Sequence, residues 1–159
     1  SINMQPELIE EIITEAMKHV NRKASEHKIS VAVNDDLLMA YADARLIIQV
    51  IINIVDNAVQ YTEPGSTIVI SAVQKINVAV IEIADNGNGI DDENKKKLFD
   101  MFYTTNNSRG DNRRGLGLGL SLCKAIINAH GGEIYVKDNH PQGSIFGFTL
   151  QVREVINHE

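Results

Sequence analysis

The chain has 159 residues, the length of one ordinary domain, and its composition of 43% apolar and 23% charged residues excludes low-complexity, collagen-like and disordered proteins. Fifteen basic and 21 acidic residues give a net charge of −6, which argues against general binding of nucleic acid or anionic lipid. Because Cys123 is the only cysteine and no apolar run approaches the roughly 20 residues of a membrane span, we expect a cytoplasmic domain without disulfides or membrane contact.

The first half of the chain predicts two helices and two short strands. The first helix is expected to begin at Pro6, because proline suits the first helical position. Strands are predicted at 29–33 and 38–42, and Asp43 suits the N-cap of a helix that ends near Tyr61. The apolar residues of the first helix keep helical spacing: Ile9, Ile13, Ala16, Met17, Val20 and Ala24.

The middle of the chain predicts a hairpin, a short helix and a long loop. Residues 67–73 and 78–85 alternate between apolar and polar side chains, as the two strands of a hairpin do. Residues 92–99 have the pattern of a short helix. Residues 103–117 lack apolar periodicity and are too many for a simple connection, so we expect a loop with a function of its own.

The last elements complete the predicted fold. A helix at 118–130 ends at the glycine pair 131–132, and strands follow at 133–137 and 144–152. The order of elements predicts a single α+β domain over residues 1–159. We expect a two-layer sandwich, with helices on one face of a mixed, mostly antiparallel sheet.

Glycine is distributed unevenly along this order of elements. The chain has 11 glycines, of which none lies in residues 1–64 and six lie between Gly87 and Gly119. Glycine gives the backbone conformational freedom and lets it approach other groups closely. The skew predicts that the first part of the chain acts through side chains and the middle part through its backbone.

Polar side chains form a stripe along the predicted helix 43–61. At 100° per residue, five of them share an arc of about 100°, and apolar residues fill most of the remainder. They are Gln49, Asn53, Asp56, Asn57 and Gln60. A solvated face is one explanation, although it would more usually consist of Lys and Glu, because asparagine is a poor helix former. The other explanation is a site that holds a polyanion and a hard cation together, since amides supply donors and acceptors without fixed charge.

Residues 85–90 (Asp-Asn-Gly-Asn-Gly-Ile) follow the second hairpin strand. A plain Asp/Asn/Gly turn explains this composition. Alternatively, Asp85 at the end of an apolar strand accepts a hydrogen bond from a ligand amine, and Gly87 and Gly89 let the backbone approach a flat ligand.

Residues 115–120 (Gly-Leu-Gly-Leu-Gly-Leu) run into the next predicted helix, where successive backbone amides could bind an anion. Residues 95–114 carry six basic and two acidic residues, a local charge of +4, although a flexible loop with incidental basic residues is an alternative. The segment is not a Walker loop, because it lacks a Gly-Lys-Ser/Thr ending. A dinucleotide oxidoreductase is also disfavoured, because Leu120 stands where its fingerprint requires a third glycine.

In combination and in this order, the segments resemble the ATP-binding catalytic domain of bacterial sensor histidine kinases. This family belongs to the GHKL superfamily, with type II topoisomerase and heat-shock-90 ATPase domains. Residues 53–61 resemble the family's N box, 85–90 its first glycine box, 99–103 its F box, 115–120 its second glycine box and 143–150 its closing hairpin. The resemblance covers essentially the whole chain.

The resemblance is also more specific in two segments. The start of the chain, from Pro6 to Asp43, and residues 129–134 (Ala-His-Gly-Gly-Glu-Ile) are similar to potassium-responsive Kdp-type sensor kinases.

The resemblance implies a Bergerat-type ATP-binding fold that binds ATP and Mg²⁺. Asn57, with Asn53 close by, would hold Mg²⁺ between the phosphates, Asp85 would accept from the adenine amino group, and Thr149 would lie near the same ring. Arg113 or Arg114 would reach the terminal phosphate. The other implied nucleotide-site residues are Gln60, Tyr61, Gly87, Gly89, Ile90, Phe99, Phe102, Tyr103, Gly115, Leu116, Gly117, Leu118, Gly119 and Leu120. Core packing alone explains the two phenylalanines about as well.

The implied reaction is transfer of the γ-phosphoryl group of ATP to a histidine that is followed by an acidic residue in a helical dimerisation segment. Of the five histidines, only His158 precedes an acid, Glu159, and it is the penultimate residue. We therefore expect the dimerisation and phosphoacceptor domain to be absent and the chain to bind nucleotide without phosphorylating itself. The implied partners are that histidine-bearing domain of the same kinase and a downstream response regulator, and the chain would be the cytosolic part of a membrane-bound sensor.

Two positions depart from the family pattern, and three other functions stay open. Gln60 replaces a lysine that touches phosphate, and Thr104 stands where a basic residue often follows the F box. Gln60 and the missing acceptor fit a nucleotide-binding or docking module without turnover. A serine kinase that regulates a sigma factor shares the fold. A hydrolysing ATPase of the superfamily has a glutamate base where Asn53 stands, and an amide cannot take a proton from water.

Overall fold

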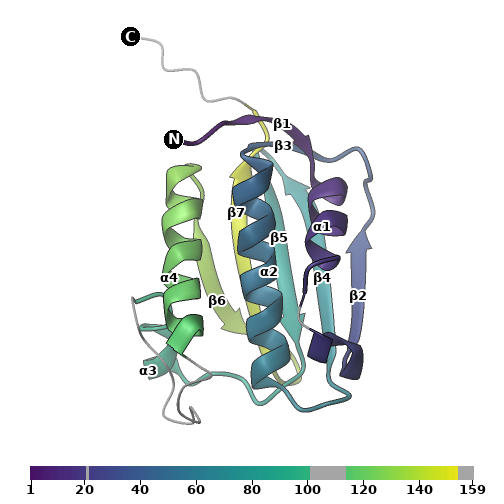
Figure 1. The fold of residues 1–159 in the computed structure, drawn as a ribbon, viewed down its shortest axis with the longest axis vertical. Coiled ribbons are helices and arrows are strands. Elements are labelled where there is room, and N and C mark those ends of the chain that lie inside the picture. Colours follow the sequence, from purple (N-terminus) through teal and green to yellow (C-terminus); the bar gives the residue numbers. More distant parts are fainter. Residues whose placement is uncertain (21, 101–113, 154–159) are drawn as a thin grey trace.

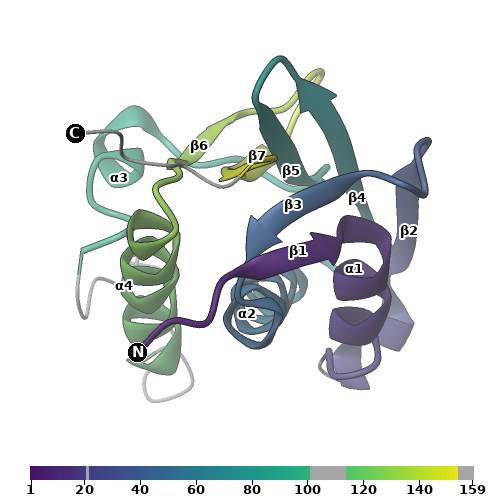
Figure 2. The same ribbon diagram turned by 90° about the horizontal axis from the view of Figure 1, so that it is seen from above.

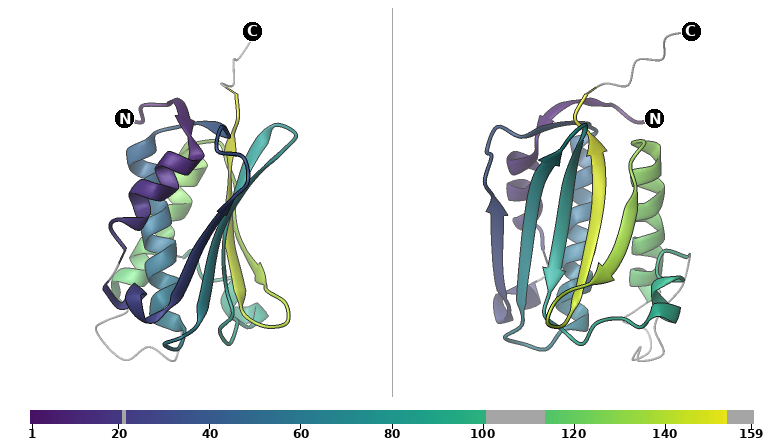
Figure 3. Two further views of the ribbon diagram at one scale, coloured as in Figure 1. Left: turned by 90° about the vertical axis from the view of Figure 1, so that its right-hand side faces the viewer. Right: turned by 180° about the vertical axis from the view of Figure 1, so that it is seen from behind.

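The computed structural model describes residues 1–20, 22–100 and 114–153. A layer of helices lies against a five-stranded sheet (Figure 1). The helices of this layer are α1 (Ile9–Met17), α2 (Ala44–Tyr61) and α4 (Arg114–Ala129). From the side, these helices cover one face of the sheet and leave the other face uncovered (Figure 3). The predicted two-layer α+β sandwich is confirmed.

The sheet has the strand order β2-β4-β5-β7-β6. β2 pairs with β4 in parallel, and the other neighbouring pairs are antiparallel, which is the predicted mixed arrangement. The strands are β2 (Lys28–Val33), β4 (Thr67–Lys75), β5 (Val78–Asp85), β6 (Ile134–Asp138) and β7 (Ser144–Gln151). Both predicted hairpins form, β4–β5 and β6–β7. The antiparallel pairing of β5 with β7 places the C-terminal end of β5 next to the start of β7.

The beginning of the chain differs from the prediction. Pro6 lies in a strand, β1 (Gln5–Leu8), which pairs with β3 (Met39–Ala42) in a separate two-stranded sheet, and α1 begins only at Ile9. Proline lacks an N–H group, and it is tolerated here because both strands of a two-stranded sheet are edges. α1 also ends at Met17, before a 3₁₀ helix, η1 (Arg22–Glu26). Val20 and Ala24 still pack against the core, so their spacing reflected burial rather than helix.

α2 packs between α1 and α4 over the middle of the sheet (Figure 2). One face of α2 is completely buried and includes Ile51 and Ile54. Along β5 and β7, buried side chains that face the helices alternate with side chains that point away from them. Phe146 and Phe148 are the largest of these buried side chains. Burying each such side chain contributes roughly 1.5–3 kcal/mol, so the core holds α2 firmly against β5.

The ends of the helices also differ in part from expectation. Asp43 precedes α2 as predicted, but its carboxylate does not cap the helix and instead accepts a hydrogen bond from Asn3 N–H at 3.0 Å, which lowers its pKa. α4 begins at Arg114, four residues before the predicted start, so tertiary structure overrides the low helix propensity of glycine. α3 (Asp92–Lys95) is shorter than the predicted helix 92–99.

Candidate functional site

The polar stripe of α2 is not a simple solvated face. Asn57 is only 5% exposed, and its Oδ1 is fully buried with no hydrogen-bond partner. Burying an amide oxygen without a partner costs stability, so such an atom calls for an explanation. Asn53, one turn earlier, accepts a hydrogen bond from Gln49 Nε2 at 2.7 Å and lies against Gly119, whose carbonyl is 3.5 Å from Asn53 Nδ2. The stripe therefore faces the first turns of α4.

Asp85 ends β5 on the helix-facing side of the sheet and is 7% exposed. Burial raises the pKa of this carboxyl above its usual value, against two backbone hydrogen bonds that lower it. The donors are the N–H groups of Gly87 at 2.9 Å and Ser144 at 3.3 Å, and both contact Oδ1. The carboxylate is thus held in a defined orientation at a cost in solvation.

The turn after Asp85 is fixed from two sides. Asn86 Oδ1 accepts from the N–H of Thr67 at the start of β4. On the other side, Asn139 Nδ2 donates to the Asp85 carbonyl at 2.8 Å, and Gln142 Nε2 donates to the Asn86 carbonyl at 2.9 Å. The loop between β6 and β7 therefore holds the backbone at Asp85 in place, although nothing in the sequence pattern indicated that contact.

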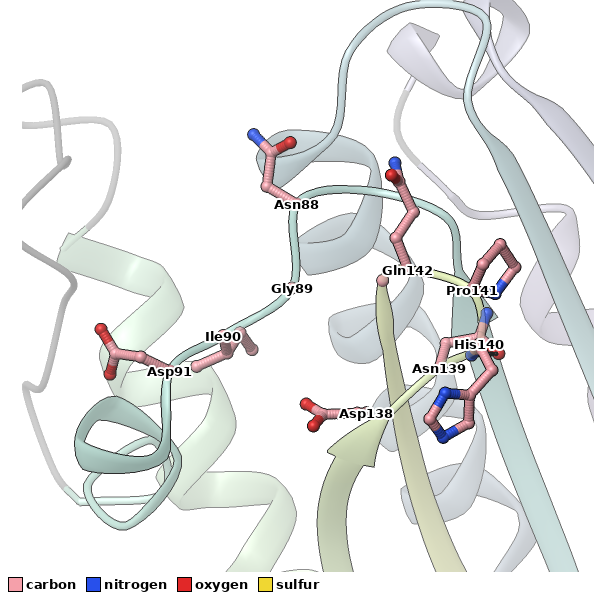
Figure 4. Close-up of a pocket in the computed structure, with 10 residues that line it drawn as sticks. Asn88, Gly89, Ile90, Asp91, Asp138, Asn139, His140, Pro141 and Gln142 are labelled. Atoms are coloured by element: carbon pink, nitrogen blue, oxygen red, sulfur yellow. Dashed lines mark hydrogen bonds between the residues drawn. The ribbon is translucent and has the colours of Figure 1, made fainter.

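Gly143 lies directly against this backbone. A Cβ atom built at Gly143 would lie 1.9 Å from the Asp85 carbonyl oxygen, and its φ of +110° is in the region that favours glycine. The 88–91 segment and the β6–β7 loop also line an open cleft of about 440 Å³ (Figure 4). Its labelled side chains are mostly amides and carboxylates, and Gly143 forms part of its wall.

Several predicted residues lie around this turn and the end of α2. Gly87 lies beside the methyl group of Thr62, just after α2. A Cβ at Gly87 would lie only 2.7 Å from Thr62 Cγ2. Gly89 has a φ of +80°. Ile90 packs against the core, and Gln60 and Tyr61 are half-buried in the last turn of α2.

The residues of the F box and of the second glycine box are described only in part. The Phe99 ring packs edge-on against Phe146, with centroids 6.3 Å apart, so core packing accounts for it. Gly115, Leu116, Gly117 and Leu118 lie within α4 rather than in a loop, followed by Gly119 and the buried Leu120. Phe102, Tyr103, Thr104 and Arg113 lie outside the described residues.

Thr149, which the resemblance places near the adenine ring, does not lie beside Asp85. Thr149 pairs with Val80 and lies on the uncovered face of the sheet, where its Oγ1 accepts from Glu133 N–H at 3.0 Å. Ser144, which is 2% exposed, occupies the position next to Asp85 instead. The alternation of buried Phe146, Phe148 and Leu150 would have assigned Ser144, and not Thr149, to the helix-facing side.

Comparison with known families agrees with this geometry. Residues 42–154, which contain α2, the Asp85 turn and α4, match the family model of histidine kinase-, DNA gyrase B- and HSP90-like ATPases. The chain belongs to this family. The match spans the segments that resemble the N box, the F box, both glycine boxes and the closing hairpin.

Individual relatives place the ATPase domain among histidine kinases. Sensor protein KdpD of Clostridium acetobutylicum is 42% identical over 149 residues, which are 94% of this chain and 17% of the relative. The catalytic domain of histidine kinase ThkA superposes with a TM-score of 0.81 at 27% identity, covering 94% of this chain and 97% of that one. ThkA in complex with response regulator protein TrrA gives a TM-score of 0.80 at 27% identity, covering 96% of this chain and 42% of that one.

The chain therefore has the fold of a histidine kinase ATPase domain and spans less than a fifth of the length of its KdpD relative. Within the residues that the structure describes, no helix is both long enough and apolar enough to cross a membrane.

Proposed function

We propose that this domain binds Mg²⁺-ATP and donates the γ-phosphoryl group to a histidine on a separate dimerisation domain of a sensor kinase. Membership of the ATPase family supports nucleotide binding. The structural observation that carries the proposal is the buried, unpartnered Oδ1 of Asn57. In a purely structural residue this buried oxygen would be expected to accept a hydrogen bond, whereas in a metal ligand it stays available to coordinate the cation.

The surroundings of Asn57 fit Mg²⁺ that is held together with phosphate. Mg²⁺ takes oxygen ligands and is commonly bound through one or two protein groups and the phosphates of its substrate. Across residues 1–20, 22–100 and 114–153, no group of three or more His, Cys, Asp and Glu side chains could form a metal cage. Asn57 Oδ1 is the proposed ligand, with Asn53 as the neighbouring amide. When bound, Mg²⁺ supplies neutralisation of the phosphate charge.

Asp85 is proposed to recognise adenine. A carboxylate accepts the hydrogen bond of an exocyclic amine, and the two N–H groups on Oδ1 orient this one before any ligand arrives. Gly87, Gly89 and Ile90 follow Asp85 and would form a wall of the adenine pocket. Ser144, rather than Thr149, would lie beside Asp85 in this pocket. The β6–β7 loop would keep this wall in position.

The phosphates are proposed to lie at the start of α4. Gly119 lies beside the α2 stripe, with its carbonyl 3.5 Å from Asn53 Nδ2, which supports this placement. Gly115 and Gly117 would let the backbone of the same helix approach the phosphates. Backbone N–H groups at a helix N-terminus stabilise phosphate. Arg113 or Arg114 would contact the terminal phosphate, and Tyr61 and Tyr103 would line the site.

Transfer is favoured over hydrolysis by the amide at Asn53. Hydrolysis needs a base to accept a proton from water, and an amide cannot serve. Phosphoryl transfer needs chiefly positioning and charge neutralisation, which the site supplies. A nucleotide-binding module without turnover is the second candidate, and Gln60 favours it because an amide in place of lysine adds no positive charge near the phosphates.

The proposed partners are the histidine-bearing dimerisation domain and a response regulator. The ThkA–TrrA complex supports the second, because ThkA contains a domain of this fold and was solved with a response regulator protein. We also propose that this domain is the cytosolic part of a membrane-bound sensor kinase, and the relationship to sensor protein KdpD supports its place in a sensor protein.

Titration calorimetry tests the nucleotide site directly. We expect wild-type protein to bind ATP with Mg²⁺ and to bind it far more weakly in EDTA. Asn57→Ala should lower the affinity for Mg²⁺-ATP by roughly 10- to 100-fold, the range for disturbed metal sites, and should leave binding in EDTA unchanged. Asn34→Ala, the same substitution in the exposed loop between β2 and β3, is the control. Equal losses with and without Mg²⁺ would show that Asn57 does not act through the metal.

A further inference from the structure

The residue that follows α2, Thr62, makes contacts in three directions. Its hydroxyl donates to the Ala58 carbonyl at 2.8 Å, so the oxygen is left to accept a hydrogen bond. His27 Nε2 lies 2.8 Å from the same oxygen, which makes Nε2–H the donor. The two bonds together fix the rotamer of Thr62. Its methyl group then points at Gly87.

The contact with Gly87 connects His27 to the adenine end of the proposed site. A Cβ at Gly87 would lie 2.7 Å from Thr62 Cγ2 and 3.2 Å from Asp85 Oδ1, so the Thr62 methyl occupies the space beside this glycine. The N–H of Gly87 in turn donates to Asp85 Oδ1. A side chain in the segment between η1 and β2 is therefore linked through one methyl contact to the carboxylate proposed to bind the adenine amine.

The segment around His27 is also held in place by its backbone. Two backbone hydrogen bonds already join this segment to the turn after α2, from Gly65 N–H to the Glu26 carbonyl at 2.7 Å and from Lys28 N–H to the Ser66 carbonyl at 2.9 Å. The other ring nitrogen of His27, Nδ1, is buried without a hydrogen-bond partner, which costs stability. An apolar side chain would avoid that cost, so the hydrogen bond from Nε2 to Thr62 is the contribution that only the imidazole makes.

We propose that His27 and Thr62 are positioning residues for adenine recognition. The Thr62 methyl group fixes the position of Gly87, whose N–H in turn orients the Asp85 carboxylate. The inference rests on the proposed nucleotide site. It assigns these two residues an effect on selectivity for the amino group of the base, with no contact to the nucleotide itself. Inosine triphosphate lacks that amino group and keeps the sugar and phosphates, so it separates the positioning effect from general binding.

The first experiment replaces His27 with methionine and measures the affinities for Mg²⁺-ATP and Mg²⁺-inosine triphosphate together with the melting temperature. We expect His27→Met to lower ATP affinity by about 3- to 10-fold, the worth of one net hydrogen bond. Affinity for inosine triphosphate should change less than about twofold and the melting temperature should not fall, because the unpartnered Nδ1 is removed. Equal losses for both nucleotides, or a lower melting temperature with unchanged selectivity, would overturn the proposal.

A second experiment tests the methyl contact without changing the histidine. Gly87→Ala should reduce the selectivity for ATP over inosine triphosphate, because its Cβ meets Thr62 Cγ2. Thr62→Ser removes the methyl and keeps the hydroxyl, so Gly87→Ala combined with Thr62→Ser should recover most of the selectivity lost in Gly87→Ala. A double variant as unselective as Gly87→Ala alone would refute the contact. If the wild type failed to bind ATP at all, the proposed function would fail instead.

Discussion

Replacing Asp85 by asparagine should affect nucleotide binding and fold stability in opposite directions. The substitution keeps Oδ1 as the acceptor for the N–H groups of Gly87 and Ser144, at 2.9 and 3.3 Å, and removes only the charge and one acceptor. A hydrogen bond to a charged group contributes roughly 1.5–3 kcal/mol. Its loss should therefore raise the dissociation constant for Mg²⁺-ATP by about 10- to 150-fold.

The stability effect follows from the raised pKa of Asp85. A carboxyl whose pKa is higher in the folded protein than in the unfolded chain favours folding at low pH. That contribution is lost as the pH rises through the folded pKa. At neutral pH the wild type therefore carries the cost of a buried charge, and Asp85→Asn does not. We expect the variant to melt at the same or a higher temperature at pH 7, and the difference to shrink as the pH falls toward the carboxyl range.

Calorimetric titration with Mg²⁺-ATP and thermal melts between pH 4 and 7 measure both effects, with each kcal/mol worth about 2–4 °C at this chain length. Asp36→Asn, an exposed carboxylate in the loop between β2 and β3, has the same charge change and should alter neither quantity. Unchanged ATP affinity in Asp85→Asn would refute the assignment of Asp85 to adenine. A fall in melting temperature of more than about 4 °C at pH 7 would instead show that its charge stabilises the fold.

Two further substitutions test the loop that supports the site and the departure at the phosphates. Gly143→Ala should lower the free energy of unfolding by about 2–4 kcal/mol in urea titrations, because its Cβ would lie 1.9 Å from the Asp85 carbonyl at a φ of +110°; an unchanged midpoint would contradict this packing. Gln60→Lys should tighten Mg²⁺-ATP binding severalfold, and the gain should weaken with added salt, since it adds a positive charge. A gain that does not depend on salt would contradict that reason.

Much of the fold could be predicted because strands and buried helices leave local patterns. Alternation along β4, β5 and β7 and the apolar face of α2 identified these elements within one or two residues. The predicted first helix is too long because the spacing of Val20 and Ala24 reflects their contact with the core. A 3₁₀ turn can provide such a contact as well as an α-helix can. The early start of α4 was missed because glycine disfavours helices in isolation.

The site could be predicted where its chemistry is carried by one segment, and not where it depends on contacts between segments. Asn57 and Asp85 were identified from the stripe and the strand end, and both are buried in ways that suit a function. Thr149 was assigned without regard to strand parity, which places Ser144 beside Asp85. The hydrogen bonds of Asn139 and Gln142 to the Asp85 turn depend on a loop more than 50 residues away, and no local pattern reports them.

Phosphoryl transfer between separate polypeptides tests the central claim most directly. The chain would be incubated with ATP labelled at the γ-phosphate and Mg²⁺, alone and with a separately prepared histidine-bearing dimerisation domain of a Kdp-type sensor kinase. The account predicts acid-labile, alkali-stable label on the added domain, its loss in Asn57→Ala, and none on the chain alone. Stable label on the isolated chain, or rapid release of inorganic phosphate without any transfer, would contradict it.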